Sequence, residues 1–461
     1  MKKGNSDSKQ ETNSSRRSFL KLMGAATAGL IASPYIKSTN VFAYGWEEKS
    51  SYLAQVAITQ ADSYDRTLIK QKVQGLFEAI GGIGDVVKLG DKVAIKINLT
   101  GGSGLPDNMW TNPEVVRAVG ELIIDCGVKG EDIYIVESLW SSSSYNDNGF
   151  PAVQQSLGAK MIDLNNPAPY SNFIQKSVGP NSFNFSSLTI NQILSDVDVY
   201  VSIPKMKQHT EAGVTCSLKN QVGIVPKDSY TITNDDGRRG ALHHKTSADS
   251  STSYLPHSIC DLNMVRPVNL AVIDGVMNAR GGEGNWSPTF KAVEDDVLLA
   301  GKNPVSTDSV AAYFMGNDPE ADTLQLPGGG ACTNYLELLH QLGAGTNQMH
   351  EIEIVGDGAS LITSVKPSGQ AQMPEGYQLC QNYPNPFNPS TRITFYLPHS
   401  EHVTVTIYNV TGQRIETLVD GQLPAGEHQL YWAANELASG VYFCEMRAAG
   451  FRETKKMMYQ K

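Results

Sequence analysis

The feature that most constrains the fold of this chain is a regular alternation, between residues 44 and 360, of short apolar segments with helix-like segments. Most of these segments contain several apolar residues in succession, whereas a strand with one exposed face alternates polar and apolar residues. Continuously apolar strands separated by helices are typical of a parallel sheet covered on both faces. We therefore predict an α/β domain over 44–360, built on a mostly parallel sheet that helices cover.

The residues that typically begin a helix allow individual helices of this domain to be predicted. Asn112 precedes Pro113 and an apolar periodic segment, a combination typical of a helix start, so we predict a helix from there to Cys126. Asn303-Pro304 marks a second helix, over Val305–Met315, in the same way. The predicted strands are Val93–Asn98, Ile133–Ser138, Val199–Ile203, Leu270–Asp274 and Glu351–Val355.

Polar side chains stand at or just beyond the ends of these predicted strands. In an open α/β sheet, ligands bind beyond the carboxyl ends of the strands, so we look for chemistry there. The sets at the strand ends are Lys96 with Asn98, Glu137 with Ser138, Lys205 with Lys207 and His209, and Asp274 with Asn278.

In one of these sets the residues are spaced so that their side chains would lie on the same face of a strand. Lys205, Lys207 and His209 are two residues apart, so in an extended chain they point to one side. Thr215, Ser217 and Lys219 repeat this spacing, and Asn220 follows them. Lysines, hydroxyls and an imidazole that converge would form an anion pocket with one proton-transfer group. The alternative is a solvated lysine face beside a polar loop.

The site hypothesis assigns roles to these residues. His209 and Asp274 are the candidate catalytic groups, Asp274 as a general base or a metal ligand. The candidate ligand-binding residues are Lys96, Asn98, Lys205, Lys207, Thr215, Ser217, Lys219 and Asn220.

The cofactor is unknown from the sequence, and a divalent metal is the candidate. His209, His243 and His257 would be its ligands, because imidazole suits transition metals. Their spacing matches no metal motif, and His244 beside His243 would point the other way in a strand. The six cysteines contain no C-x-x-C pair, so we expect no iron–sulfur cluster.

The N-terminal residues 1–43 have the layout of a secretory signal. The pair Arg16-Arg17 precedes an apolar run, Leu22 to Ala32, and Val41-Phe42-Ala43 offers small residues for cleavage. The paired arginines resemble a twin-arginine signal, which implies the twin-arginine translocase as a partner and export through the periplasm. The alternative is a membrane anchor, but the run is shorter than the about 20 residues that span a bilayer. We expect no stable membrane span elsewhere.

The C-terminal part begins with a change of composition. Residues 361–379 are rich in Ser, Pro, Gly and Gln, as in a linker, and 380–461 contain short strands separated by turn residues. We predict an antiparallel immunoglobulin-like β-sandwich there, in which Cys380 and Cys444 are the pair to consider for a disulfide. Its predicted strands are Arg392–Leu397, His402–Asn409, Arg414–Leu418, Glu427–Trp432, Val441–Met446 and Arg452–Tyr459.

Several short motifs of this part resemble the type A sorting domain of type IX secretion cargo. They are N-Y-P-N-P-F-N-P-S-T from Asn382, V-T-I-Y-N-V-T-G from Val405, L-A-S-G-V-Y-F from Leu437, and Lys455-Lys456 near the end. The resemblance implies the type IX secretion machinery as a partner, and a place at the cell surface or in the medium. An adhesion module of immunoglobulin type is the alternative.

The α/β part resembles the family called domain of unknown function 362. The family has no settled activity, so the resemblance implies a domain and no reaction. Some relatives carry ferredoxin-like cysteine clusters, which this chain lacks. The matching pieces are Val93–Asn98 with 111–116, I-P-K-M-K-Q-H from Ile203, G-V-T-C-S-L-K-N from Gly213 with Gly223–Pro226, V-I-D-G-V from Val272, and L-A-G-K-N-P-V-S-T-D-S-V-A-A from Leu299.

The net charge of −10 and the pI of about 5.4 argue against a nucleic-acid partner. The leading hypothesis is an exported enzyme that acts on an anionic small molecule. The alternative is a non-catalytic ligand-binding protein at the cell surface, and a third reading is a structural surface protein.

Overall fold

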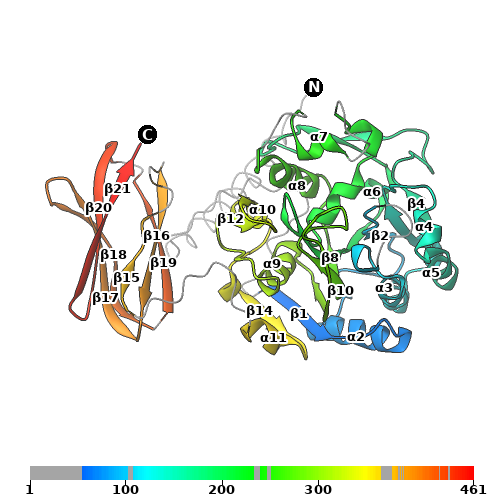
Figure 1. Ribbon diagram of the computed structural model, residues 1–461, viewed down its shortest axis with the longest axis horizontal. Helices are drawn as coiled ribbons and strands as arrows, with labels where there is room; N and C mark the ends of the chain where they lie inside the picture. Colours follow the sequence, from blue (N-terminus) through cyan, green and yellow to red (C-terminus); the bar gives the residue numbers. More distant parts are fainter. Residues whose placement is uncertain are drawn as a thin grey trace, which may run out of the picture.

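The computed structural model describes residues 54–101, 107–232, 239–246, 251–364 and 376–460, the last range with short gaps at 383–384, 386, 388, 425 and 435–436. The predicted signal over 1–43 lies outside these residues. Within them, residues up to 364 form a large mixed sheet flanked by helices, and the residues from 376 form two antiparallel sheets (Figure 1).

The large sheet has the strand order β14-β1-β11-β10-β7-β2-β3-β4, and β8 and β9 branch from β10. Within this order β11 alone runs antiparallel to its neighbours, so the expected mostly parallel sheet is confirmed. The strands are β1 (Ala54–Gln60), β2 (Val93–Ile97), β3 (Ile133–Glu137), β4 (Lys160–Asp163), β7 (Val199–Ile203), β8 (Lys205–His209), β9 (Gly213–Thr215), β10 (Leu270–Arg280), β11 (Lys291–Gly301) and β14 (Ile352–Val355).

The central strands β2, β3 and β7 are buried throughout because both of their faces are covered. Neighbouring residues of a strand point to opposite faces, so Ala94 packs into one hydrophobic core and Ile95 into the other. One core contains α2 (Arg66–Ala79), α3 (Pro113–Asp125) and α5 (Phe150–Leu157); the other contains α8 (Tyr254–Val265), α9 (Pro304–Phe314), α10 (Tyr335–Gln341) and α11 (Ala359–Ser364).

The predicted helix starts are confirmed in detail. The side chain of Asn112 accepts a hydrogen bond from the backbone of Glu114, and Asn303 accepts one from Ser306. The remaining short elements are α4 (Ser144–Asp147), α6 (Ile193–Asp196), α7 (Gly240–His243), the hairpins β5 (Ile174–Ser177) with β6 (Ser187–Ile190) and β12 (Thr323–Gln325) with β13 (Ala331–Thr333), and the 3₁₀ turns η1 (Asp107–Met109), η2 (Gly130–Asp132), η3 (Lys219–Ile224), η4 (Lys227–Ser229) and η5 (Met349–Glu351).

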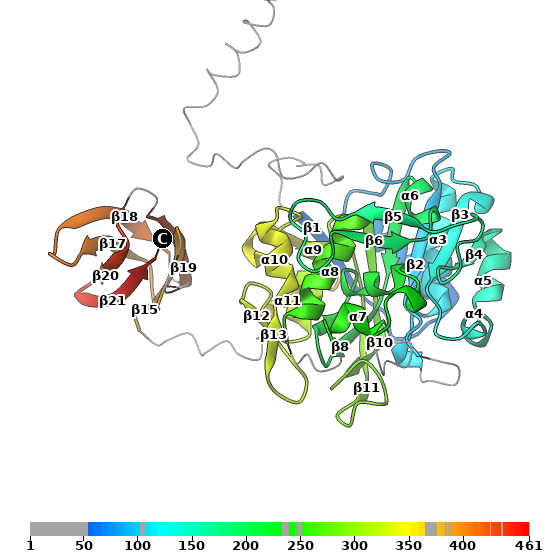
Figure 2. The same ribbon diagram turned by 90° about the horizontal axis from the view of Figure 1, so that it is seen from above.

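Strand β10 differs from its prediction, because it continues past Asp274 to Arg280. The extra residues pair with the first part of β11, and the end of this β10–β11 hairpin projects beyond the rest of the sheet (Figure 2). The local sequence does not predict this extension, because the backbone of the added residues is hydrogen-bonded by β11, which begins only after the turn at 281–290.

The C-terminal strands form the predicted sandwich. One sheet has the order β15-β16-β19 and the other β18-β17-β20-β21, with Trp432, Phe387 and Phe395 in the shared core. The strands are β15 (Gln378–Leu379), β16 (Ser390–Leu397), β17 (Glu401–Asn409), β18 (Arg414–Leu423), β19 (Gly426–Ala433), β20 (Gly440–Ala448) and β21 (Phe451–Tyr459).

The disulfide considered between Cys380 and Cys444 is absent, and all six cysteines are free thiols. Cys380 donates its backbone N–H to Thr394 in one sheet of the sandwich, whereas Cys444 is buried in β20 of the other. In the part of the chain described here, no helix combines the length and the apolar character needed to cross a bilayer.

Candidate anion-binding site

The site is built around strand β8, which branches from the central strand β10. Lys205, Lys207 and His209 occupy alternate positions of β8, and all three side chains are buried. Met206, between the lysines, packs into the hydrophobic core instead. The alternation that the sequence predicts is therefore present, and it directs the three polar side chains to one side of β8.

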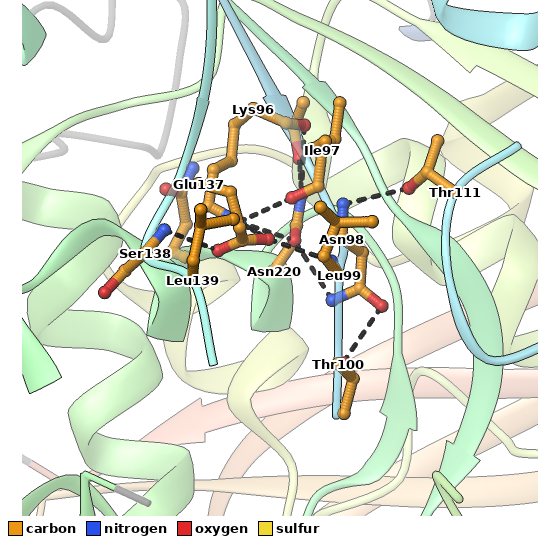
Figure 3. Close-up of polar contacts among 12 residues, drawn as sticks. Lys96, Ile97, Asn98, Leu99, Thr100, Thr111, Glu137, Ser138, Leu139 and Asn220 are labelled. Carbon is orange, nitrogen blue, oxygen red and sulfur yellow. Dashed lines mark hydrogen bonds and ion pairs between the residues drawn. The ribbon is translucent and has the colours of Figure 1, made fainter. Parts of the chain in front are cut away.

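Lys96, at the end of β2, lies in a closed network (Figure 3). Its Nζ donates to Oε2 of Glu137 at 3.0 Å, to Oδ1 of Asn220 at 3.0 Å and to its neighbour's carbonyl, Ile97 O, at 2.6 Å. Burial lowers the pKa of Lys96, and the Glu137 carboxylate opposes this shift. Three acceptors for three N–H groups leave this ammonium without a free donor.

The two predicted asparagines belong to the same network. Asn220 accepts from Asn98 as well as from Lys96, and donates to Ser202 and to the backbone of Lys96. The backbone of Asn98 donates to Thr111, whose hydroxyl donates to Ile203 O. Lys96, Asn98 and Asn220 thus join the ends of β2, β3 and β7 to η3, and their polar groups bond to one another.

A second closed network surrounds Lys205. Its Nζ lies 2.7 Å from Oδ2 of Asp274 and donates to Tyr64 OH and to Met277 O. The Tyr64 hydroxyl donates to Oδ1 of Asp274 at 2.6 Å, and the backbone of Asn112 donates to Oδ2. Burial and the Asp274 charge raise the pKa of Tyr64. Asp274, a predicted catalytic residue, is therefore the counter-ion of Lys205.

Lys207 is different from these two lysines. It is fully buried, and within the described residues its Nζ makes one hydrogen bond, to Met109 O at 2.7 Å. Burial and the charge of Lys219 lower the pKa of Lys207 to about 7. Thr215 lies opposite Lys207 in the β8–β9 ladder, and its buried hydroxyl has no hydrogen-bond partner. This ammonium keeps donors available for a ligand.

Lys219 is the second buried cation of this kind. It begins η3, and no hydrogen bond or ion pair joins its Nζ to any other described residue. Burial lowers the pKa of Lys219 to about 8. The turn before it is held by Asp308 of α9, whose carboxylate accepts from the backbone of Ser217 and Leu218. Asp308 thus fixes the backbone of the turn that leads into Lys219.

Two neutral imidazoles stand beside these lysines, with opposite tautomers. Nδ1 of His209 accepts from the backbone of Glu211, so its proton is on Nε2. Nδ1 of His243 lies 3.2 Å from Arg239 O and must donate to that carbonyl, so its Nε2 is an acceptor. Burial, reinforced by the charge of Lys219, lowers the pKa of His209 well below its usual range and that of His243 to about 3.

Two further charged residues, Arg239 and Glu283, lie near Lys207 and Lys219. Arg239 is buried and donates to Val225 O and Ser138 O. Glu283, on the β10–β11 hairpin, accepts from the backbone and hydroxyl of Thr210 and from the indole of Trp286. The carboxylate acts electrostatically on Lys207 and Lys219 but forms no ion pair with either.

A cavity of about 120 Å³ adjoins this region. Thr210, Glu211 and His243 are among its lining residues, and the first two follow His209 directly in the chain. The cavity therefore lies beside His243 and the loop that follows β8, and Lys207, Lys219 and His209 are not among the residues that line it.

The predicted metal ligands do not come together. His257 lies on α8 with its ring stacked on Phe183, the centroids 4.7 Å apart. Burial alone lowers the pKa of His257, whereas His243 contributes to the lowered pKa of His209. Nowhere in the described ranges do three His, Cys, Asp or Glu side chains form a group suited to a metal ion.

Sequence reasoning missed several residues of this region: Tyr64, Arg239, Glu283 and Asp308. Tyr64 and Arg239 carry no local signal, because each lies in a loop far along the chain from its partner. Asp308 carries no clear local signal either, because Ser306, Thr307 and Ser309 beside it are also polar, and only the structure shows that this part of α9 is buried.

Comparison with protein families decides the nature of the α/β part: residues 93–313 match the family model of the domain of unknown function DUF362. The chain carries a DUF362 domain. Residues 381–460 match the secretion system C-terminal sorting domain, so both resemblances seen in the sequence are confirmed. The sorting domain implies the type IX secretion machinery as a partner, and the chain is exported to the cell surface or the medium.

A curated relative of the DUF362 domain is a thylakoid-associated protein of Synechocystis sp.. It is 26% identical over 267 residues, which cover 57% of this chain and 75% of the relative.

Among solved structures, PorZ of the Porphyromonas gingivalis type IX secretion system is 20% identical over 21% of this chain and 13% of its own, with a TM-score of 0.14. The lactate racemase apoprotein of Thermoanaerobacterium thermosaccharolyticum is 16% identical over 58% of this chain and 57% of its own, with a TM-score of 0.32. The chain thus spans less than two thirds of either protein, and similarities of this size transfer no function.

Proposed function

We propose that the DUF362 domain binds an anionic small molecule through Lys207 and Lys219, and that His209 moves a proton to or from it. The observation that carries the proposal is the contrast among four buried lysines. Lys96 and Lys205 each have a carboxylate partner, whereas Lys207 and Lys219 have none among the described residues.

The contrast matters because a buried charge is costly unless an opposite charge is near. A fold that needed only stability would replace Lys207 or Lys219 by an apolar residue of similar volume. A carboxylate or phosphate ligand supplies the missing negative charge and accepts the unused N–H groups. Lys96 and Lys205 then serve to hold the strand ends in place, and they do not contact the ligand.

The imidazoles favour an enzyme over a simple binding protein. His209 offers an N–H and His243 offers a lone pair, so one can give a proton while the other accepts one. Their lowered pKa values keep both rings neutral at pH 7. Of the two neutral rings, His243 has the free lone pair of a general base, whereas His209 has an N–H that can give a proton. The nearby cations would stabilise a negative charge that develops on the ligand.

The binding step is tested by calorimetric titration of the full chain with inorganic phosphate and a series of small carboxylates. Lys207→Met and Lys219→Met should each weaken anion binding at least about tenfold, since a hydrogen bond to a charged group is worth about 1.5–3 kcal/mol. Lys291→Met, which removes an exposed lysine of β11, is the matched control. Equal affinities in all four proteins would exclude the anion site.

The catalytic step is tested separately, by NMR detection of deuterium exchange into the bound anion in D₂O. His243→Gln, which removes the free lone pair, and His209→Gln, which removes the imidazole N–H, should each abolish exchange while the affinity for the anion stays within about twofold. Binding without exchange in the unmodified protein would support the non-catalytic surface protein instead.

We further propose the order of parts along the chain: a twin-arginine signal over 1–43, the α/β domain over 44–360, a linker over 361–379 and the sorting domain over 380–461. The family matches at 93–313 and 381–460 support the two folded parts. Helix α11 continues to Ser364, so the first residues of the linker are helical. Export of a reporter fused after residue 43, with and without Arg16→Lys and Arg17→Lys, tests the signal.

A further inference from the structure

Arg239 has a backbone conformation that residues with a side chain rarely adopt. Its φ is 58° and its ψ is 42°, in the left-handed region, where the Cβ atom of an L-residue crowds the backbone. Glycine adopts this conformation without strain, yet the chain has an arginine here, and it is only 5% exposed. A strained residue of this kind persists where the surrounding contacts fix it, so the contacts of Arg239 indicate its role.

The guanidinium group of Arg239 is anchored on two backbone carbonyls. Its Nη2 donates to Ser138 O at 2.7 Å, and its Nε donates to Val225 O at 3.2 Å. Ser138 directly follows β3 and Val225 directly follows η3, and the backbone of Ser138 donates to Gly223 O, which joins the two segments. The rigid fork of a guanidinium reaches both carbonyls at once, which the compact ammonium of a lysine on its flexible stem does not reproduce.

The backbone carbonyl of Arg239 determines the tautomer of His243. Arg239 O accepts from the backbone of Leu242 at 2.9 Å and lies 3.2 Å from Nδ1 of His243. A carbonyl can only accept, so Nδ1 carries the proton of the neutral ring and Nε2 keeps its lone pair. Leu242 and His243 belong to α7, a helix of four residues, which is too short to hold its shape by itself. The direction of this carbonyl therefore depends on how residue 239 is fixed.

We infer that Arg239 is a positioning residue for His243: its guanidinium, held by Ser138 and Val225, aims its carbonyl at Nδ1 and so keeps the lone pair of the ring on Nε2. Leu242 is fully buried in the hydrophobic core and holds α7 there independently of the guanidinium. Without the guanidinium, α7 should stay in place while the carbonyl turns away and the proton moves to Nε2. The inference rests on the proposed function, in which His243 is the proton acceptor, and it adds the residue that prepares this group.

The tautomer is measured by NMR of the full chain at pH 7 with ¹⁵N-labelled histidine, because protonated and unprotonated ring nitrogens differ in chemical shift. His243→Gln assigns the signals. In the unmodified protein His243 should carry its proton on Nδ1. Arg239→Lys, which keeps the charge, and Arg239→Gly, which suits the left-handed backbone, should each move the proton to Nε2. The melting temperature of each variant shows whether the fold is kept.

Two controls isolate the effect of the guanidinium at this position. His209, whose Nδ1 accepts from the backbone of Glu211, is the internal reference, and its tautomer should not change in any variant. Arg117→Lys is the matched substitution, since Arg117 is a buried arginine of α3 that also donates to a backbone carbonyl, Ala152 O. It should leave the proton of His243 on Nδ1.

A second readout links the tautomer to the chemistry. Arg239→Lys should slow deuterium exchange into the bound anion at least about tenfold, with the affinity within about twofold, because a general base contributes about 10²–10⁴-fold. Three results would overturn the inference: a proton on Nε2 of His243 in the unmodified protein, a proton that stays on Nδ1 in both Arg239 variants, or exchange that stays fast after the proton has moved.

Failure of the proposed function gives a different pattern. If His243→Gln leaves exchange unchanged, or the unmodified protein shows no exchange, it is the proposed proton transfer that fails. The tautomer of His243 in the two Arg239 variants still decides whether Arg239 positions the ring, because that measurement needs neither the anion nor the reaction.

Discussion

Gly223 packs directly against the carboxylate of Glu137: a Cβ atom on Gly223 would lie 2.2 Å from Oε1 of Glu137 and 2.8 Å from Nζ of Lys96. The backbone carbonyl of Gly223 also accepts from Ser138, so the contact cannot be relieved by a simple shift of the turn. The buried ion pair between Lys96 and Glu137 therefore requires glycine at this position.

Gly223→Ala should accordingly lower the free energy of unfolding by about 3 kcal/mol or more, because the new methyl group must break a buried ion pair. Gly75→Ala is the matched control, since a Cβ at this mid-helix position of α2 meets no atom within 4 Å. The control should gain about 0.5–1 kcal/mol from the higher helix propensity of alanine. Urea unfolding measures both, and equal stabilities of the two variants would contradict the packing argument.

Replacing buried lysines by methionine should affect stability with opposite signs. Lys96→Met leaves Glu137 buried without its cation, at a cost of about 3–5 kcal/mol. Lys207→Met removes a buried charge that has no carboxylate partner, so it should stabilise the ligand-free protein by about 1 kcal/mol or more at pH 6. Urea unfolding at pH 6 provides the comparison, and destabilisation by Lys207→Met would show that this lysine is part of the structural framework.

The lowered pKa values of Lys207 and Lys219 predict how stability depends on pH. Between about pH 7 and 10.5 the unfolded chain holds protons on these amines that the folded chain has released, so folding stability rises with pH. Anion affinity should fall over the start of the same range, because a neutral amine attracts an anion weakly. Melting temperatures from pH 6 to 10 test this, and a Lys207→Met/Lys219→Met double variant should flatten the rise.

His243 predicts a loss of stability on the acid side. Burial holds the pKa of its folded form near 3, whereas in the unfolded chain it protonates near 6.5. Protons therefore favour the unfolded state below pH 6.5, and stability falls as the pH drops toward 3. His243→Gln should make this fall less steep. If His243→Gln leaves the loss of stability between pH 6.5 and 3 unchanged, the pKa of His243 is not lowered in the folded protein.

The Tyr64 hydroxyl bridges Lys205 and Asp274, so Tyr64→Phe should cost about 1–3 kcal/mol of unfolding free energy. Tyr170→Phe removes a hydroxyl that donates to Asp196 at the surface, and it should cost less than about 1 kcal/mol. Thermal unfolding of the two variants side by side provides the measurement. A similar loss for both would argue that the bridge adds little.

The local sequence predicted the elements well. Asn112 and Asn303 mark helix starts because a capping side chain acts on backbone groups two or three residues away. The apolar strands and the alternation of Lys205, Lys207 and His209 are equally local, since neighbouring residues of a strand face opposite ways. The sorting domain was recognisable for a similar reason, because its motifs are short and contiguous.

The sequence by itself therefore determined a covered, mostly parallel sheet, a C-terminal sandwich, and the set of strands that carry basic residues. Only the tertiary structure decided which of these lysines are neutralised, because an ion pair depends on which distant strand end lies within about 4 Å. Glu137 and Asp274 reach Lys96 and Lys205 across the sheet, and none of the described carboxylates reaches Lys207 or Lys219. That difference in distance, which no spacing along the chain encodes, separates the framework from the candidate site.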